Sequence, residues 1–171
     1  MNVPVKIKND LFPDLLLRNI NELDQDHLRN WKNENNLFFF YKGIITSTDQ
    51  MKWYCGYLSR ENDFMFIVTI QSRDIGCTGI RCVDDKWDIY NVILGDNCFK
   101  GKGYMSMALT MMCSFALLTN RLPITAKVLC LNPAIDWYKK NSFQIAHQQD
   151  DYYEIVLDQQ EFTPCPLNIT F

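Results

Sequence analysis

The sequence is poor in the side chains that hold metal ions. It contains only two histidines, and its seven cysteines include no C-x-x-C pair. Because structural zinc sites use several Cys or His ligands at short spacings, we expect no metal. The odd number of scattered cysteines also argues against a disulfide framework. Most of them lie in apolar stretches, where a reduced cysteine acts as a small hydrophobe, so we expect free thiols and a cytoplasmic protein.

Basic runs and long apolar runs are also missing. With 17 Lys and Arg against 20 Asp and Glu, the formal charge is −3 and no basic stripe is present, so we expect no nucleic-acid partner. No stretch approaches the ~20 apolar residues of a membrane span, and Met1–Pro4 lack the apolar core of a signal peptide. We therefore expect no membrane partner either.

The length and composition fit one compact unit. The 171 residues, 47% of them hydrophobic, suffice for a sizeable core. We expect a single domain over residues 1–171, with its core at about 15–157 and a C-terminal tail at 158–171, acting as a monomer or homodimer.

Alternating strand and helix patterns predict a mixed α/β sheet flanked by helices. The predicted strands are Leu15–Leu17, Phe64–Ile70, Ile75–Arg81, Trp87–Leu94 and Ile124–Leu131, followed by a hairpin of Phe143–His147 and Tyr152–Leu157. The predicted helices are Asp24–Asn33, a second beginning at a capping box over Ser47–Gln50, Gly103–Thr119, and one from Asn132 to about Asn141. The tail from Glu161 to Phe171 has no readable pattern.

The predicted helices carry their own signals. Leu28 and Trp31 fall on the buried face of the first, and Met51, Tyr54 and Leu58 on that of the second. In the last helix, Asn132 has the character of an N-cap and is followed by proline, which suits a first helical turn.

A glycine-containing loop joins the third strand of the central run to the longest helix. This loop holds three of the seven glycines, Gly95, Gly101 and Gly103. The first amides of a helix have no internal partners and carry the positive end of its dipole, so the junction predicts a phosphate site. A dinucleotide fingerprint would need glycine where Ser106 stands, and no P-loop pattern is present. A simple tight turn into the helix remains the alternative.

Two segments resemble the GNAT superfamily of N-acetyltransferases, within it most closely the ribosomal-protein N-terminal and bacterial amino-sugar acetyltransferases. The likeness runs from about Leu15 to Leu157. Lys100–Met105 is similar to the family's pyrophosphate loop, Q/R-x-x-G-x-G/A, with Lys100 for Arg or Gln and Met105 for the last Gly or Ala. The second segment matches the family at Asn132, Ala134, Tyr138, Lys140 and Phe143, with Ser142 in place of a glycine.

The resemblance implies a fold and a donor. The fold is α/β, with a GNAT-like mixed, largely antiparallel central sheet splayed into a V and flanked by about four helices. The donor is acetyl-CoA, whose pantetheine arm would pair with the backbone of Val92, Ile93 and Leu94 if the sheet opens after Leu94. The residues expected at its pyrophosphate are Lys100, Gly101, Lys102, Gly103, Tyr104, Met105 and Ser106, with the side chain of Asn132 nearby.

The same resemblance suggests the catalytic groups. Tyr138 occupies the family's general-acid position and would protonate the departing thiolate; its alternative role is a core tyrosine. Many relatives carry a strand glutamate where this chain has Ile89. Asp88 lies one residue earlier, and because adjacent strand residues face opposite sides, it can serve as the base only if the strand bulges. Otherwise Asp88 is a solvated carboxylate and water acts as the base.

The expected acceptor contacts are Trp31, Asn33, Glu34 and Phe39, because the segment from Trp31 to Tyr41 lies where the family covers its acceptor. Packing of this segment on the core or on a partner subunit is the alternative. At pH 7 a lysine ε-amine is free in about one molecule in 2,500, an α-amine in roughly one in ten. Without a strong base, we expect a small primary amine, a nucleotide-linked amino sugar ahead of a protein N-terminus. A non-catalytic coenzyme A sensor is the alternative, favoured by Met105 and the missing strand carboxylate.

Overall fold

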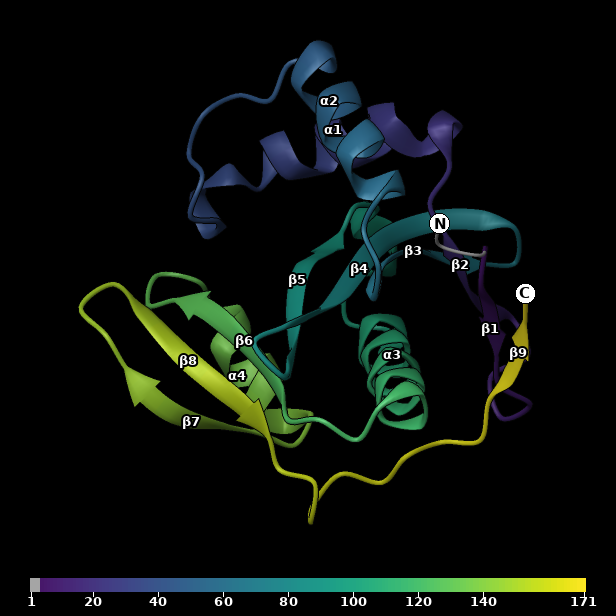
Figure 1. Ribbon diagram of the computed structural model, residues 1–171, viewed down its shortest axis with the longest axis vertical. Coiled ribbons are helices and arrows are strands. Elements are labelled where there is room, and N and C mark those ends of the chain that lie inside the picture. The colour runs from purple at the N-terminus through teal and green to yellow at the C-terminus, as the bar shows by residue number, and fades with distance from the viewer. Residues whose placement is uncertain (1–3) are drawn as a thin grey trace.

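The computed structural model describes residues 4–171. Met1, Asn2 and Val3 lie outside the described residues. They are the start of the predicted domain and most of the segment Met1–Pro4, for which no signal peptide was predicted. Residues 4–171 form a nine-stranded sheet in the order β7-β8-β6-β5-β4-β3-β2-β1-β9 (Figure 1). Every strand contact is antiparallel except the parallel pair of β5 and β6. This confirms the predicted mixed, largely antiparallel α/β fold.

The elements have the following bounds. The strands are β1 (Lys6–Lys8), β2 (Leu15–Asn19), β3 (Asp63–Ile70), β4 (Arg73–Val83), β5 (Lys86–Leu94), β6 (Ile124–Leu129), β7 (Phe143–Gln148), β8 (Tyr152–Leu157) and β9 (Asn168–Thr170). The helices are α1 (Gln25–Glu34), α2 (Ser47–Leu58), α3 (Tyr104–Thr119) and α4 (Ala134–Lys140), with short 3-10 turns η1 (Glu22–Asp24), η2 (Asn36–Phe38) and η3 (Asn97–Phe99).

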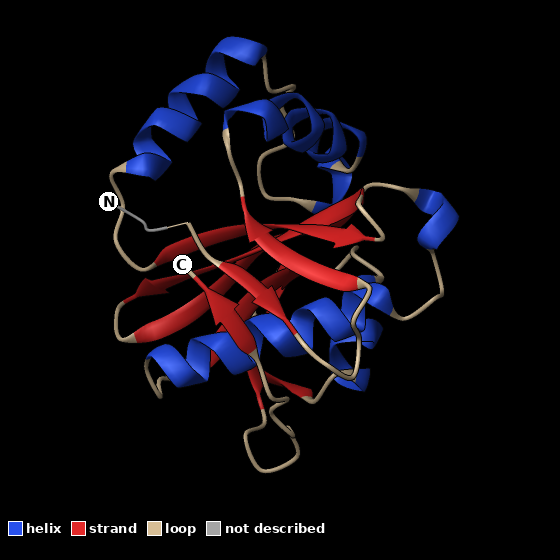
Figure 2. Cartoon of the chain, turned by 90° about the vertical axis from the view of Figure 1, so that its right-hand side faces the viewer, coloured by secondary structure: helices blue, strands red, loops and turns tan. Residues whose placement is uncertain are grey.

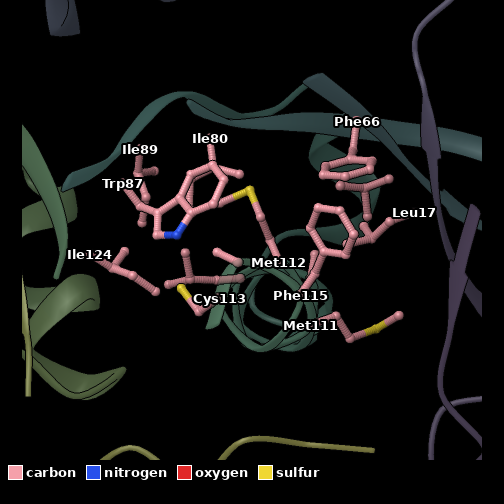
Figure 3. Packing of buried hydrophobic residues seen from close by; sticks show 14 of the residues in the cluster. Leu17, Phe66, Ile80, Trp87, Ile89, Met111, Met112, Cys113, Phe115 and Ile124 are labelled. Atoms are coloured by element: carbon pink, nitrogen blue, oxygen red, sulfur yellow. The ribbon is translucent and has the colours of Figure 1, made fainter. Parts of the chain in front are cut away.

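The helices cover both faces of the sheet (Figure 2). On one face α3 packs Met112 and Phe115 against Phe66 and Trp87 (Figure 3). The C-terminal tail covers part of the outer side of α3, where the amide of Cys165 donates to Ser114 Oγ at 3.0 Å. A helix buried on several sides in this way can be apolar nearly all round, as α3 is.

The opposite face carries α1 and α2. Leu28 and Trp31 of α1 and Tyr54 and Tyr57 of α2 form a second apolar cluster with the sheet, here including Ile93 of β5. The side chains of a strand alternate between the two faces, so a residue of β5 contacts either the α3 side or the α1 and α2 side. The face on which a β5 side chain lies therefore decides whether it can contact the expected acetyl donor or the expected amine acceptor.

The sheet opens between β5 and β6. The two strands pair only from Trp87 to Ile89, opposite Ile124 to Ala126, and then diverge. The predicted V is therefore present, but it opens after Ile89 and not after Leu94 as expected. A bulge accompanies the divergence: Asn91 and Val92 lie opposite a single residue of β4, and Asn91 has φ +50°. Asn tolerates this left-handed conformation better than most residues, and a bulge bends its strand.

Several element ends differ from the sequence predictions. The capping box of α2 is formed by Thr46 and Asp49, one residue earlier than predicted. Tyr57 is buried on this helix, while Leu58 is exposed. The structure starts α4 at Ala134, although the Asn132 side chain still accepts from the Ala134 amide at 2.9 Å. The sequence analysis also missed β1 and β9, which pair with each other from opposite ends of the chain.

Candidate active site

A cavity of about 780 Å³ lies where β5 and β6 diverge. Its walls come from the start of α3, the end of β5, β6, the start of α4 and the loop after η2. Of the predicted site residues, those that line it are Phe39, Asp88, Val92, Leu94, Lys100, Gly101, Gly103, Tyr104, Met105, Ser106, Asn132 and Tyr138. Those that do not are Trp31, Asn33, Glu34, Ile93 and Lys102.

The loop before α3 has a conformation that suits glycine. Gly101 has φ +75° and Gly103, directly before the helix, has φ +81°. A Cβ atom at either position would meet nothing within 4 Å, so the backbone conformation selects glycine here and crowding does not. The unpaired amides of the first turn of α3 lie at the cavity, with Ser106 Oγ accepting from Trp137 Nε1 at 2.8 Å. This bond ties the start of α3 to α4.

The end of β5 presents one backbone edge to the gap. The Gly95 amide donates to the Ile75 carbonyl at 2.8 Å, and this bond flanks the pair of Gly76 and Leu94. In an antiparallel ladder, a pair flanked in this way turns its own N–H and C=O groups away from each other. Leu94 therefore directs its amide toward the gap, whereas Ile93, one residue earlier, directs its backbone toward β4.

Tyr138 lies in α4, where its ring packs edge-on against Trp137 and Phe143 at centroid distances of 4.9 and 5.3 Å. Burial raises the pKa of its hydroxyl above the ordinary value, and Cys113 and Asp88 add smaller effects in the same direction. The hydroxyl therefore keeps its proton throughout the neutral range. Tyr138 is both a packed core residue and a cavity residue, so its two predicted roles are compatible.

Asp88 enters the cavity as one half of an ion pair. Arg81 of β4 donates to its Oδ2 from Nε at 3.0 Å and from a terminal nitrogen at 2.8 Å. Its neighbours Trp87 and Ile89 pack with α3, so Asp88 faces the α1 and α2 side. The strand does bulge, at Asn91, as the prediction for Asp88 required.

The predicted acceptor residues of α1 have other contacts in the structure. The indole of Trp31 is buried against Gly95, where an added Cβ would lie 2.1 Å from the ring. Asn33 exchanges two hydrogen bonds of 2.9 Å with the backbone of Ile45, which holds the following loop. Glu34 is exposed. Of this group, the structure brings only Phe39 to the cavity wall.

The sequence reasoning missed three cationic residues in the cavity: Lys32, Arg81 and Lys127. Arg81 and Lys127 lie on β4 and β6, and Lys32 lies on α1. Lys32 contacts Phe39, with Nζ 3.4 Å from the ring centroid. Strand alternation could have predicted which residues share a face with Arg81 and Lys127. It could not predict that this face borders the gap between β5 and β6, because that depends on how the strands pair.

The cavity fits coenzyme A on its own features. It combines unpaired helix amides, two glycines with positive φ and open space above them, and the free edge of Leu94. Lys100 adds a cation at the mouth. No group of three or more His, Cys, Asp or Glu side chains within residues 4–171 is arranged to hold a metal ion. Over the same residues, no helix is long and apolar enough to cross a membrane.

Comparisons with known proteins agree with this geometry. The family model described as "Acetyltransferase (GNAT) domain" matches residues 14–159. No curated protein sequence gives a significant match. A solved spermidine N-acetyltransferase from Vibrio cholerae, in complex with CoA and spermine, superposes with a TM-score of 0.74 at 17% identity, over 87% of this chain and 98% of that one.

Two further solved structures share the fold. RimL, a ribosomal L7/L12 alpha-N-protein acetyltransferase in complex with coenzyme A, has a TM-score of 0.66 at 17% identity, over 84% of this chain and 91% of that one. Apo FdhC, a nucleotide-linked sugar GNAT, has a TM-score of 0.73 at 16% identity, over 95% of this chain and 93% of that one. At these identities the likeness establishes the fold alone.

Proposed function

This chain belongs to the GNAT acetyltransferase family, which uses acetyl-CoA, and we propose that it acetylates the amine of a nucleotide-linked amino sugar. The single observation that carries the choice of acceptor is the excess of positive charge on the α1 and α2 side of the cavity. That side holds Arg81 and Lys127 but, among the described lining residues, one carboxylate, Asp88, which Arg81 already pairs.

The donor would be held by the other end of the cavity. The amides at the start of α3 and the side chain of Lys100, which line the cavity, would bind the pyrophosphate, and the amide of Leu94 would pair with an extended chain in the gap. Val92 and Asn132 line the wall between them. When bound, acetyl-CoA supplies the thioester that a free amine attacks.

The chain's own groups complete the transfer. The Leu94 amide is the donor best placed to stabilise negative charge at the thioester oxygen, in the manner of an oxyanion hole. The Tyr138 hydroxyl, neutral at physiological pH, holds the proton that the leaving sulfur takes up. No enzyme nucleophile is needed. Asp88, which Arg81 holds through its Oδ2, would accept hydrogen bonds from the incoming ammonium group.

The acceptor side suits a nucleoside diphosphate better than a polyamine. A guanidinium and an ammonium group attract phosphate oxygens and repel a polycation. The adjoining loop exposes two aromatic residues of the cavity wall, Phe40 at 52% and Tyr41 at 60%. Aromatic faces of this kind stack on nucleobases, for which each contact contributes about 1–3 kcal/mol in nucleic-acid complexes.

Turnover with a panel of amines tests the proposal. We expect thiol release from acetyl-CoA to have its highest kcat/KM with a nucleotide-linked amino sugar, compared with the free amino sugar, an N-terminal peptide and spermidine. Lys127→Gln should raise the KM of the nucleotide-linked substrate about tenfold, because a charge-assisted contact contributes about 1.5–3 kcal/mol when fully formed and less when solvated.

The controls separate this proposal from its rivals. Lys127→Gln should leave the KM for acetyl-CoA unchanged, since Lys127 lies on the opposite side of the sheet from the α3 amides. A higher kcat/KM for spermidine or for a peptide would overturn the proposed acceptor. Binding of coenzyme A without turnover of any amine would instead favour a sensor.

A further inference from the structure

Lys32 is a largely buried lysine whose ammonium group lies between two cavities. It lies in the last turn of α1 and borders both the main cavity and a smaller one of about 300 Å³ on the α1 and α2 side. Asn91, the left-handed residue of the β5 bulge, borders the same two cavities. Lys32 Nζ donates to Asn91 Oδ1 and lies 3.4 Å from the centroid of the Phe39 ring.

Lys32 and the bulge residue Asn91 therefore contact each other between the expected donor side and the expected acceptor side of the main cavity. After Asn91, Val92 and Leu94 line the main cavity where the donor is expected, whereas Ile93 does not. Before Asn91, Tyr90 and Asp88 line the acceptor side. An amine in the main cavity beside Asn91 would lie close to Lys32 Nζ, because both residues line that cavity and contact each other.

We infer that the neutral Nζ of Lys32 is the base that removes a proton from the acceptor ammonium group before acetyl transfer. This inference rests on the proposed function. The acceptor arrives as R–NH3⁺ and gives one proton to the Lys32 lone pair, which leaves a free amine and a lysine ammonium. The new C–N bond then forms as the C–S bond breaks, Tyr138 gives its proton to the departing sulfur, and the second amine proton returns through water to the Tyr138 oxygen. Lys32 returns its proton to water.

Burial without an ion-pair partner among the described residues makes the neutral form of Lys32 accessible near neutral pH, although the Asn91 amide oxygen and the Phe39 ring both stabilise the ammonium form. Within residues 4–171, no carboxylate lies within 4.0 Å of its Nζ. Burial lowers the pKa of Lys32 to about 8, against a smaller raising effect of Cys77. With this pKa, about one Lys32 in ten is neutral at pH 7, compared with about one in 2,500 for an ordinary lysine. General-base catalysis is most efficient when the pKa of the base lies near the working pH, as that of Lys32 does.

The other titratable groups around Lys32 do not compete for this task. Cys77 of β4 has its thiol pKa raised to about 12 by burial and stays neutral. Asp49 of α2, in the smaller cavity, caps its own helix through Thr46. The remaining charged or titratable side chains of the main cavity are Tyr41, Arg81, Asp88, Tyr90, Lys100, Tyr104, Lys127 and Tyr138. Among them the single carboxylate, Asp88, is held by Arg81.

The first test needs neither acetyl-CoA nor turnover. The free protein is labelled with trace acetic anhydride between pH 6 and 11, and the modified fraction of each lysine is measured by mass spectrometry against Nα-acetyl-lysine in the same tube. We expect the reactivity of Lys32 to rise with a midpoint near pH 8, well below the ordinary lysine value of about 10.4. A midpoint at or above that of the reference amine would overturn the inference.

The second test uses the shape of the pH profile. Lys32→Arg keeps the charge but cannot act as a base, and Lys32→Met removes both; thermal unfolding and coenzyme A binding confirm that each variant is folded. We expect kcat to fall about 100-fold or more at pH 7, in line with the loss of a general base. The loss should shrink toward pH 9.5, where the acceptor is already a free amine.

The matched control is Lys52→Arg, on the exposed side of α2. It should leave kcat unchanged at every pH. Asp88→Asn should lower activity by a similar factor across the pH range if Asp88 only orients the acceptor. A pH-independent loss in the Lys32 variants, or no loss, would refute the base role while leaving the proposed function intact. Absence of wild-type turnover would refute the proposed function itself, and the labelling midpoint would still be measurable.

Discussion

One hydroxyl group, that of Tyr138, decides whether the proposed transfer can be completed. We expect Tyr138→Phe to lower kcat by about 100-fold or more, because a thiolate leaves poorly without a proton donor. The ring keeps its edge-on contacts with Trp137 and Phe143, so stability should change little. Initial rates at saturating substrates measure the loss.

The binding of coenzyme A and the pH profile provide the checks on this expectation. Calorimetry should give the same affinity for coenzyme A in Tyr138→Phe as in the wild type. Because burial raises the pKa of the Tyr138 hydroxyl, the wild-type rate should show no decline caused by its ionisation between pH 6 and 9. Unchanged kcat in Tyr138→Phe, with Tyr153→Phe as the packing control, would contradict the general-acid role.

At the residue scale, the sequence predicted a cavity residue correctly where a motif specified both the residue type and its position in a helix or loop. Tyr138 and the glycines at 101 and 103 line the cavity because each sits at a fixed offset from a helix end. Lys32 was not predicted because the pattern around it identifies Trp31 as the buried residue and says nothing about its neighbour. Its contact with Asn91 depends on a left-handed bulge residue that no periodicity reveals.

At the scale of elements, α4 ends in a strained conformation that can be relieved. Ser142 follows the helix with φ +65°, at the position where the resemblance predicts a glycine. A left-handed conformation costs a non-glycine residue roughly 1–2 kcal/mol, while glycine loses about 0.5–1 kcal/mol more backbone entropy on folding. We therefore expect Ser142→Gly to raise the free energy of unfolding by about 0.5–1 kcal/mol.

Chemical denaturation measures this change in the free energy of unfolding. The control is Ser59→Gly at the end of α2, where φ is −92° and no left-handed strain exists, so glycine there should destabilise. Equal effects of the two substitutions would show that Ser142 is not strained.

The existence and type of the central strands followed from local chemistry, whereas several element ends and the short strands β1 and β9 did not. The pattern of β3 to β5 predicted three consecutive strands, because long runs of β-branched and aromatic residues are bounded by turn residues, and the family resemblance implied a largely antiparallel sheet. β1 and β9 have three residues each and pair across the whole length of the chain. Such short strands carry too little alternation to be recognised, and their pairing depends on the completed sheet.

At the scale of the whole molecule, the proposed function depends on a sheet whose strands β5 and β6 are only partly paired. β5 and β6 share three residue pairs, from Trp87 to Ile89, and the donor is expected to occupy the gap beyond them. The resemblance predicted this opening, but it begins after Ile89, two residues before the bulge residue Asn91. A tertiary feature of this kind is not encoded in the pattern of β5 alone.

The two backbone edges of β5 should respond differently when the gap is filled. Leu94 directs its amide toward the gap, whereas Ile93 directs its own toward β4. We expect saturating coenzyme A to slow hydrogen exchange at Leu94 markedly, because the pantetheine arm takes the place of a neighbouring strand. Ile93 should change much less, since β4 already pairs it, and the ratio of the two rates, measured by NMR, removes any global stabilisation by the ligand. Equal slowing at both amides would mean that coenzyme A only stabilises the fold and does not occupy the gap between β5 and β6.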